Sequence, residues 1–127
     1  MGAGARVLVV EDNEKNMKLF RDVLHASGYR TLEATTGGRA LELAIEYAPD
    51  LVLMDVQLPD IDGVEALGRL LTDGRTASLP VLALTAQAME GDRERFLAAG
   101  FDGYLSKPVN VVDLVATVAR YCEAGDR

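Results

Sequence analysis

The chain has 127 residues, enough for one domain with a sizeable core and too few for two domains of ordinary size. Hydrophobic residues make up 49% and charged residues 26%, as in a typical globular protein. The formal net charge of −7, without any block of Lys or Arg, argues against nucleic acid as a direct partner. Cys122 is the single cysteine, which excludes an internal disulfide, and no apolar stretch approaches the ~20 residues of a membrane span. We expect one cytoplasmic domain over residues 1–127, with its core at about 6–122 and no membrane insertion.

Short apolar runs alternate with longer stretches of helical periodicity along the chain. The runs are typical of strands buried on both faces, and they lie at 6–10, 30–34, 51–54, 81–84 and 103–106. The run at 30–34 is more polar than the others, which predicts a strand near an edge of the sheet.

Capping residues set the expected ends of the helices. Asp12 or Asn13 is predicted to cap the first helix, and Gly28 to end it. The other helices are expected at 37–47, from Asp62 through 71, at 89–99, and from Asn110 to about 122.

This regular alternation of strand and helix predicts the fold class. Five β-then-α units indicate an α/β protein in which five helices cover both faces of a parallel sheet through right-handed crossovers. Sheets of this kind bind ligands at the carboxyl ends of their strands.

Residues suited to phosphoryl chemistry follow four of the predicted strands. They are Glu11 and Asp12 after the first strand, Asp55 after the third, Thr85 after the fourth, and Lys107 with Pro108 after the fifth. We expect these side chains to gather at one edge of the sheet. Three ionised carboxylates within a few ångströms of one another require a cation or raised pKa values. Mg²⁺ suits such oxygen ligands, and the calcium alternative is weakened because the chain has no EF-hand spacing.

The expected chemistry is the transfer of a phosphoryl group to a carboxylate. Asp55 follows the predicted central strand, so it is the candidate acceptor, with Glu11 and Asp12 as metal ligands. Lys107 would neutralise charge on the transferred group, and Thr85 would donate a hydrogen bond to it. Phosphatases of the haloacid-dehalogenase type also use a strand-end Asp nucleophile, but they place a second Asp two positions later as general acid and base. This chain has Gln57 there, so sustained turnover as an enzyme is not expected.

Five motifs together resemble the receiver domain of two-component response regulators over essentially the whole chain. They are Val9-Val10-Glu11-Asp12-Asn13, Leu53-Met54-Asp55-Val56-Gln57-Leu58-Pro59, Asp62-Gly63, Leu84-Thr85-Ala86 and Ser106-Lys107-Pro108. The resemblance implies a flavodoxin-like sheet of order 2-1-3-4-5 and a single receiver domain. It implies Asp55 as phosphoacceptor, and Mg²⁺ held by Glu11, Asp12, Asp55 and the backbone carbonyl of Gln57. It also implies that Thr85 and Lys107 contact the phosphate and that Tyr104, with Thr85, is the switch.

Partners follow from the same resemblance. A histidine kinase or a histidine phosphotransferase is expected as donor, and a downstream protein is expected to bind the face of the fourth helix, fifth strand and fifth helix. Docking residues for the donor are predicted at Asn16, Met17, Phe20 and Pro108. The periodicity of the first helix places Phe20 toward the core and leaves Met17 and Leu19 near the surface. We expect a monomer or a weak dimer.

Within the family, the stretches 11–14, 16–20, 55–59 and 89–92 resemble stand-alone regulators of the bacterial cell cycle. The same stretches also occur among receivers attached to hybrid histidine kinases. A receiver excised from such a kinase or from a longer response regulator is therefore an alternative. A pseudo-receiver that only binds proteins is a second alternative, although it would normally lose the acidic residues or the lysine.

Overall fold

The computed structural model describes residues 4–86 and 91–123. Its centre is a five-stranded parallel sheet of order β2-β1-β3-β4-β5, which confirms the predicted order and places the more polar strand at an edge. The strands are β1 (Arg6–Val10), β2 (Arg30–Ala34), β3 (Leu51–Asp55), β4 (Val81–Thr85) and β5 (Gly103–Ser106). β3 and β4 each run one residue beyond the predicted apolar run, so Asp55 and Thr85 are the last residues of their strands.

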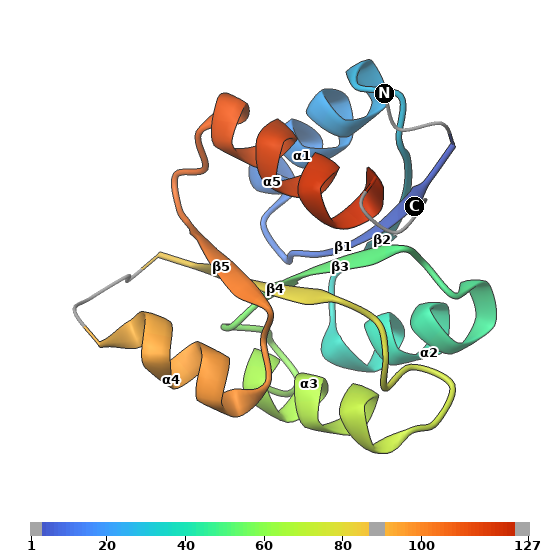
Figure 1. Cartoon of the computed structure of the whole chain (residues 1–127), viewed down its shortest axis with the longest axis vertical. Coiled ribbons are helices and arrows are strands. Elements are labelled where there is room, and N and C mark those ends of the chain that lie inside the picture. The colour runs from blue at the N-terminus through green and yellow to red at the C-terminus, as the bar shows by residue number, and fades with distance from the viewer. Residues whose placement is uncertain (1–3, 87–90, 124–127) are drawn as a thin grey trace.

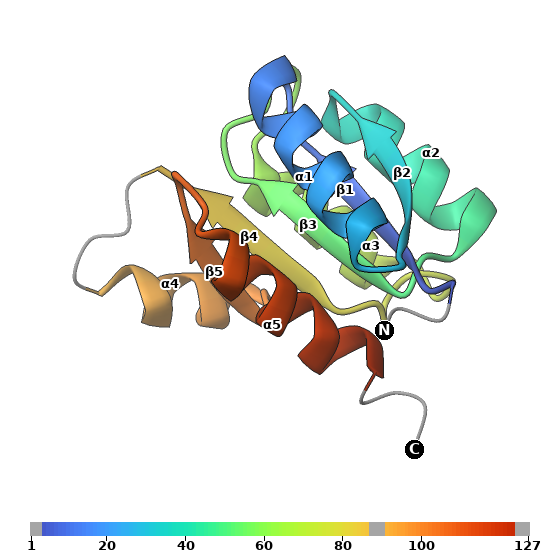
Figure 2. The same ribbon diagram turned by 90° about the horizontal axis from the view of Figure 1, so that it is seen from above.

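Five helices cover the two faces of this sheet, as predicted. They are α1 (Glu14–Ala26), α2 (Gly37–Tyr47), α3 (Gly63–Thr72), α4 (Asp92–Ala99) and α5 (Val111–Glu123). Helices α1 and α5 lie on one face, and α2, α3 and α4 lie on the other (Figures 1 and 2). Within the described residues, no helix is long and apolar enough to cross a membrane.

Side-chain caps explain where several helices begin. Asn13 caps α1 by accepting a hydrogen bond from the Asn16 N–H at 3.1 Å, which decides between the two caps predicted for this helix. Asp62 accepts from the Glu65 N–H at the start of α3 in the same way, at 2.8 Å. Helix α4 was predicted from Met89, but residues 87–90 lie outside the described part of the chain, where the helix begins at Asp92.

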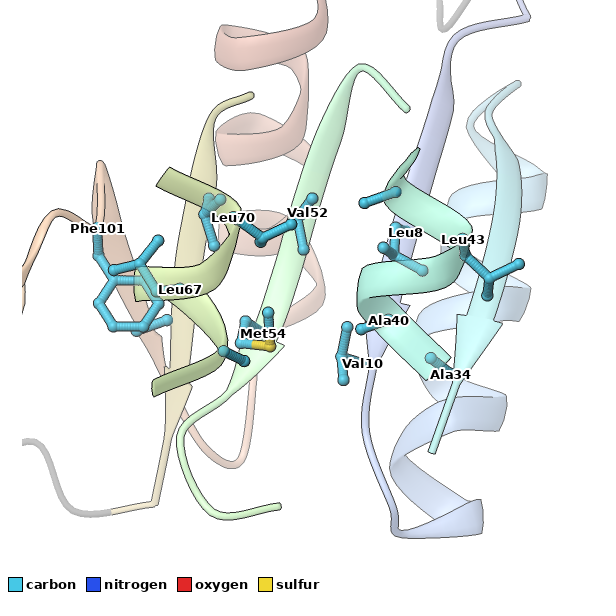
Figure 3. Packing of buried hydrophobic residues seen from close by; sticks show 14 of the residues in the cluster. Leu8, Val10, Ala34, Ala40, Leu43, Val52, Met54, Leu67, Leu70 and Phe101 are labelled. Atoms are coloured by element: carbon cyan, nitrogen blue, oxygen red, sulfur yellow. The ribbon is translucent and has the colours of Figure 1, made fainter. Parts of the chain in front are cut away.

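Two buried clusters hold the layers together, because alternate residues of each strand point to opposite faces of the sheet. One cluster joins the sheet to α2, α3 and α4, with Leu8, Val52 and Met54 of the strands packed against Leu43 and Leu67 (Figure 3). The opposite cluster joins the sheet to α1 and α5 through Val9, Leu53, Phe20, Leu114 and Val118. Both faces of the sheet are therefore covered by a buried core.

The expectation that Met17 lies near the surface was wrong. Met17 is only 5% exposed and belongs, with Phe20 and Leu24, to the cluster between the sheet and helices α1 and α5, which we call the α1–α5 cluster. Residues 17, 20 and 24 share one helical face at the i, i+3, i+7 spacing, and Leu19, on another side, is 37% exposed. Met17 and Phe20 thus serve the core, and neither offers an open side chain for docking.

Candidate functional site

The register of the sheet brings the chemically useful strand ends together. β1 pairs with β3 through Val10 and Met54, and β4 pairs with β5 through Thr85 and Ser106. Glu11 and Asp12 therefore follow β1 beside the end of β3, where Asp55 stands, while Lys107 follows β5. The predicted convergence of these residues is confirmed.

Three carboxylates form the acidic half of the site. Glu11, Asp12 and Asp55 each offer an oxygen, and these oxygens all lie within 4.8 Å of one another. Glu11 is 1% exposed and Asp55 is 5% exposed, whereas Asp12 is open to solvent. Several acidic oxygens with one open side suit Mg²⁺, which binds through one or two carboxylates and keeps some of its waters. The donor set therefore fits the predicted metal.

Lys107 contacts two of the carboxylates at almost equal distances. Its Nζ lies 2.7 Å from Glu11 Oε1 and 2.8 Å from Asp55 Oδ2. Burial lowers the pKa of Lys107, but hydrogen bonds to Asp55 and Glu11 outweigh burial, so the pKa lies above its usual value. The lysine is therefore a permanent cation at neutral pH.

Burial raises the pKa of Glu11, because a carboxylate loses solvation inside the protein. Hydrogen bonds from Lys107 and from the Asn13 N–H lower this pKa in part, but it stays above its usual value. Asn16, predicted as a docking residue, donates from its side-chain amide to Glu11 Oε1 at 3.5 Å. Asn16 thus lies at the edge of the acidic site.

Asp55 is held at both carboxylate oxygens. Oδ2 accepts from Lys107, and Oδ1 accepts from the Gln57 N–H at 2.8 Å. A cleft of about 300 Å³ opens at this point, lined among others by the three carboxylates, Asn16, Gln57 and Lys107. Gln57 therefore borders the same cleft as the acidic residues.

Thr85 and Tyr104 belong to β4 and β5, which lie on the side of β3 opposite to β1. Thr85 is buried at the end of β4, and its carbonyl oxygen accepts from the Lys107 N–H at 2.7 Å. Tyr104, in the neighbouring strand, is half-buried, and its ring centroid lies 5.9 Å from that of Phe96 in α4. Pro108 is exposed, and its bond to Lys107 is cis. Of the residues named from the sequence, Phe20 faces the core as predicted, whereas Met17, expected near the surface, is buried.

Gly63 also contributes to the site, and its contribution was not predicted from the sequence. Its N–H donates to the Val56 carbonyl at 3.0 Å, which closes the loop that follows β3. The Asp62-Gly63 pair was noted only as a motif and a helix start. A glycine at the first position of a helix, where a side chain is usual, was the available signal of a close backbone approach.

The comparisons with known proteins agree with this geometry. The family profile of the response regulator receiver domain matches residues 7–119. The chain therefore belongs to the response regulator receiver family of two-component signalling proteins.

The curated relatives narrow the resemblance further. The polar-differentiation response regulators DivK of Brucella anthropi and Brucella abortus are each 49% identical over 115 residues, 91% of this chain and 94% of theirs. The predicted resemblance within the family is thus confirmed as a similarity to these polar-differentiation response regulators, which the match covers over nearly their full length.

Solved structures of receivers share the fold. A receiver domain of a sensor histidine kinase from Pseudomonas aeruginosa has a TM-score of 0.87 at 36% identity, over 95% of this chain and 99% of its own. That structure has a magnesium ion coordinated in its active-site cleft. A chemotaxis response regulator of Vibrio cholerae has a TM-score of 0.87 at 28% identity, over 93% of this chain and 98% of its own.

Proposed function

We propose that this chain is a stand-alone receiver that accepts a phosphoryl group on Asp55 and thereby switches its contacts with other proteins. The donor is a histidine kinase or a histidine phosphotransferase, and the transfer depends on Mg²⁺. The observation that carries the proposal is the Asp55 carboxylate, 2.8 Å from Lys107 Nζ and clustered with the carboxylates of Glu11 and Asp12. One receiver domain, with its core at about 6–122, performs this role in the cytoplasm.

Each residue of the site has a separate role in the transfer. A carboxylate oxygen of Asp55 forms the new P–O bond while the P–N bond to the donor imidazole breaks and that ring leaves with its electron pair. Lys107 keeps its proton and pairs with an oxygen of the transferred group. Glu11, Asp12, Asp55 and the Gln57 carbonyl would hold Mg²⁺, which supplies further neutralisation of phosphoryl charge. The chain is a signalling protein, not an enzyme with sustained turnover.

The switch uses Thr85 and Tyr104. The Thr85 hydroxyl moves toward the phosphoryl oxygens, and the Tyr104 ring takes the space that this movement leaves. The face of α4, β5 and α5 then presents a different surface to a downstream protein. Support comes from the position of Tyr104, which belongs to β5 and whose ring packs against Phe96 of α4, so it joins two of the three elements of that face. In either state we expect a monomer or a weak dimer.

Cell-cycle signalling is the finer part of the proposal, and it rests on the 49% identity to the DivK proteins. A receiver that belongs to a longer histidine kinase is the second candidate. It is favoured by the 36% identity to the kinase-borne receiver of Pseudomonas aeruginosa. The purely binding pseudo-receiver is disfavoured because the acidic residues and Lys107 are all in place.

The test is a phosphorylation assay with Mg²⁺ and acetyl phosphate, read by intact-protein mass. We expect a phosphate-sized mass increase in the wild type and in Asp22→Asn, a control carboxylate exposed on α1, and none in Asp55→Asn. Thr85→Val, which keeps the shape but loses the hydroxyl, should slow adduct formation about 100-fold or more, as when one donor to a transition state is lost. An unmodified wild type, or an adduct that persists in Asp55→Asn, would refute the proposal.

A further inference from the structure

Asp60, in the loop between β3 and α3, reaches the start of a helix that lies more than twenty residues earlier in the chain. Its Oδ1 accepts from the Gly37 N–H at 2.8 Å, and its Oδ2 accepts from the Gly38 N–H at 2.9 Å. These are the first two N–H groups of α2, which have no partner within the helix. The side chain of Thr36, the local cap, accepts from the Arg39 N–H at 3.2 Å, which leaves the N–H groups of Gly37 and Gly38 to Asp60. Asp60 thus completes the cap of α2 from another part of the chain.

A second contact fixes the same part of the loop. A Cβ on Gly37 would lie 2.5 Å from Cγ1 and 2.9 Å from Cδ1 of Ile61. The absence of a side chain at Gly37 therefore lets Ile61 pack directly over the first turn of α2. Asp60 and Ile61 together join the loop to α2 by a polar and an apolar contact.

This loop carries Gln57, which borders the cleft of the acidic site. Near its start, the Gln57 N–H is bonded to Asp55 Oδ1, and at its end the Gly63 N–H is bonded to the Val56 carbonyl. Asp60 lies between these two anchors, and its carboxylate joins the middle of the loop to a neighbouring helix. Bonds from backbone N–H groups to an ionised carboxylate are stronger than neutral ones. The loop is therefore held at both ends and at its centre.

We propose that Asp60 is a positioning residue that sets the Mg²⁺ affinity of the Asp55 site by holding the 57–62 loop against the start of α2. Mg²⁺ demands near-ideal octahedral geometry, so a displacement of the loop that carries one of its ligands weakens binding. Groups that orient metal ligands through hydrogen bonds act in the same way. Because this inference rests on the proposed function, its test must separate a failure of Asp60 from a failure of the metal site.

The hydrogen bonds from Gly38 and Gly37 also keep Asp60 ionised, because they lower its pKa to about 2. The carboxylate is therefore able to accept both bonds throughout the neutral range. An Asn at position 60 keeps one acceptor oxygen and loses the charge, so it should preserve part of the contact.

The experiment is a titration of the full chain with MgCl₂, followed by amide chemical shifts, for the wild type and for Asp60→Ala and Asp60→Asn. We expect Asp60→Ala to bind Mg²⁺ about tenfold more weakly than the wild type, the lower end of the loss seen when ligand-orienting groups are removed. Asp60→Asn should bind with intermediate affinity. Thermal unfolding of each variant shows that it is folded at the titration temperature, and Asp60→Asn serves alone if Asp60→Ala is not.

Two controls separate positioning from other effects. Thr36→Ala removes the local cap of α2 without touching the 57–62 loop, so it should lower stability and leave Mg²⁺ affinity unchanged. Asp62→Asn removes one negative charge from the same loop and keeps an oxygen that can cap α3, so it measures the charge effect alone.

The outcomes are distinct. Equal Mg²⁺ affinity in the wild type and both Asp60 variants would overturn the inference and leave the proposed function standing. A loss in Asp60→Ala that is matched by Thr36→Ala or by Asp62→Asn would overturn it too, since helix stability or charge would then explain the effect. A wild type that does not bind Mg²⁺ would overturn both proposals.

Discussion

Gly63 lies so close to Asp55 that a Cβ on Gly63 would be 2.5 Å from the backbone carbonyl oxygen of Asp55. The same Cβ would be 2.7 Å from the Cα of Val56. Both neighbours are backbone atoms, so they could give way only if the end of β3 moved. The first residue of α3 is therefore packed directly against the main chain of the candidate phosphoacceptor.

We expect Gly63→Ala to lower the free energy of unfolding by about 1–3 kcal/mol, the usual cost of forcing an extra group into a close-packed position. It should also slow phosphorylation by acetyl phosphate, because the shift needed to admit the methyl group displaces Asp55. Gly68→Ala is the control within the same helix, since a Cβ there meets nothing within 4 Å. That variant should be stabilised by up to about 1 kcal/mol through helix propensity. Urea unfolding measures the free energy of unfolding of both variants. Equal changes in stability at the two glycines would contradict the close approach of Gly63 to β3.

Lys107 and Mg²⁺ should stabilise the folded protein through the same carboxylates, those of Glu11 and Asp55. Lys107→Met keeps most of the side-chain volume but leaves Glu11 and Asp55 without their ammonium donor. In EDTA we expect it to lower the free energy of unfolding by about 3–5 kcal/mol, the cost of removing one partner of a buried ion pair. Saturating Mg²⁺ should narrow the gap, because the dication supplies the positive charge that the carboxylates have lost.

Lys18→Met is the control for this comparison, because Lys18 pairs with Asp22 on the exposed side of α1. It should change stability little with or without Mg²⁺. A Lys107→Met deficit that Mg²⁺ leaves unchanged would mean that the lysine and the metal do not serve the same carboxylates.

Asp60 should make stability depend on acid. Its pKa in the folded protein is about 2, below the ~3.9 of an unfolded Asp. A lowered pKa means that the unfolded state binds the proton more readily, so the contribution of Asp60 is present above pH ~4 and is lost as the pH falls toward 2. The stability difference between wild type and Asp60→Asn, measured by urea unfolding, should therefore shrink across this range. A stability difference that stays constant between pH ~4 and pH ~2 would count against the carboxylate cap.

Met17 and Leu19 should differ sharply in what their removal costs. Met17→Ala opens a cavity in the α1–α5 cluster and should cost about 2–5 kcal/mol. Leu19→Ala removes a side chain that is already 37% exposed and should cost well under half as much. Thermal unfolding of the two variants checks the assignment, and comparable losses would argue that Leu19 is also part of the core.

Much of the fold was accessible from the sequence because local patterns encode it. Runs such as 51–54 are apolar on both faces, and the alternation with helical stretches leaves a parallel sheet as the simplest arrangement. The carboxyl ends of parallel strands share one edge, so Glu11, Asp55 and Lys107 could be brought together without any tertiary information. Met17 was misplaced because the inward face of the first helix was drawn from residues 20, 23 and 24, although the i, i+3, i+7 spacing puts Met17 on the same face as Phe20 and Leu24.

The sequence by itself therefore determined the class of fold, the edge of the sheet at which the candidate site lies and the residues that form it. Only the tertiary structure decided how these residues share their partners. Lys107 contacts Glu11 as closely as Asp55, Gly63 presses on the backbone of Asp55, and Asp60 caps a helix that begins 23 residues before it. Such contacts depend on how loops are placed against elements distant in sequence. No local periodicity carries that information, because the energy of each contact arises only when both partners are already in position.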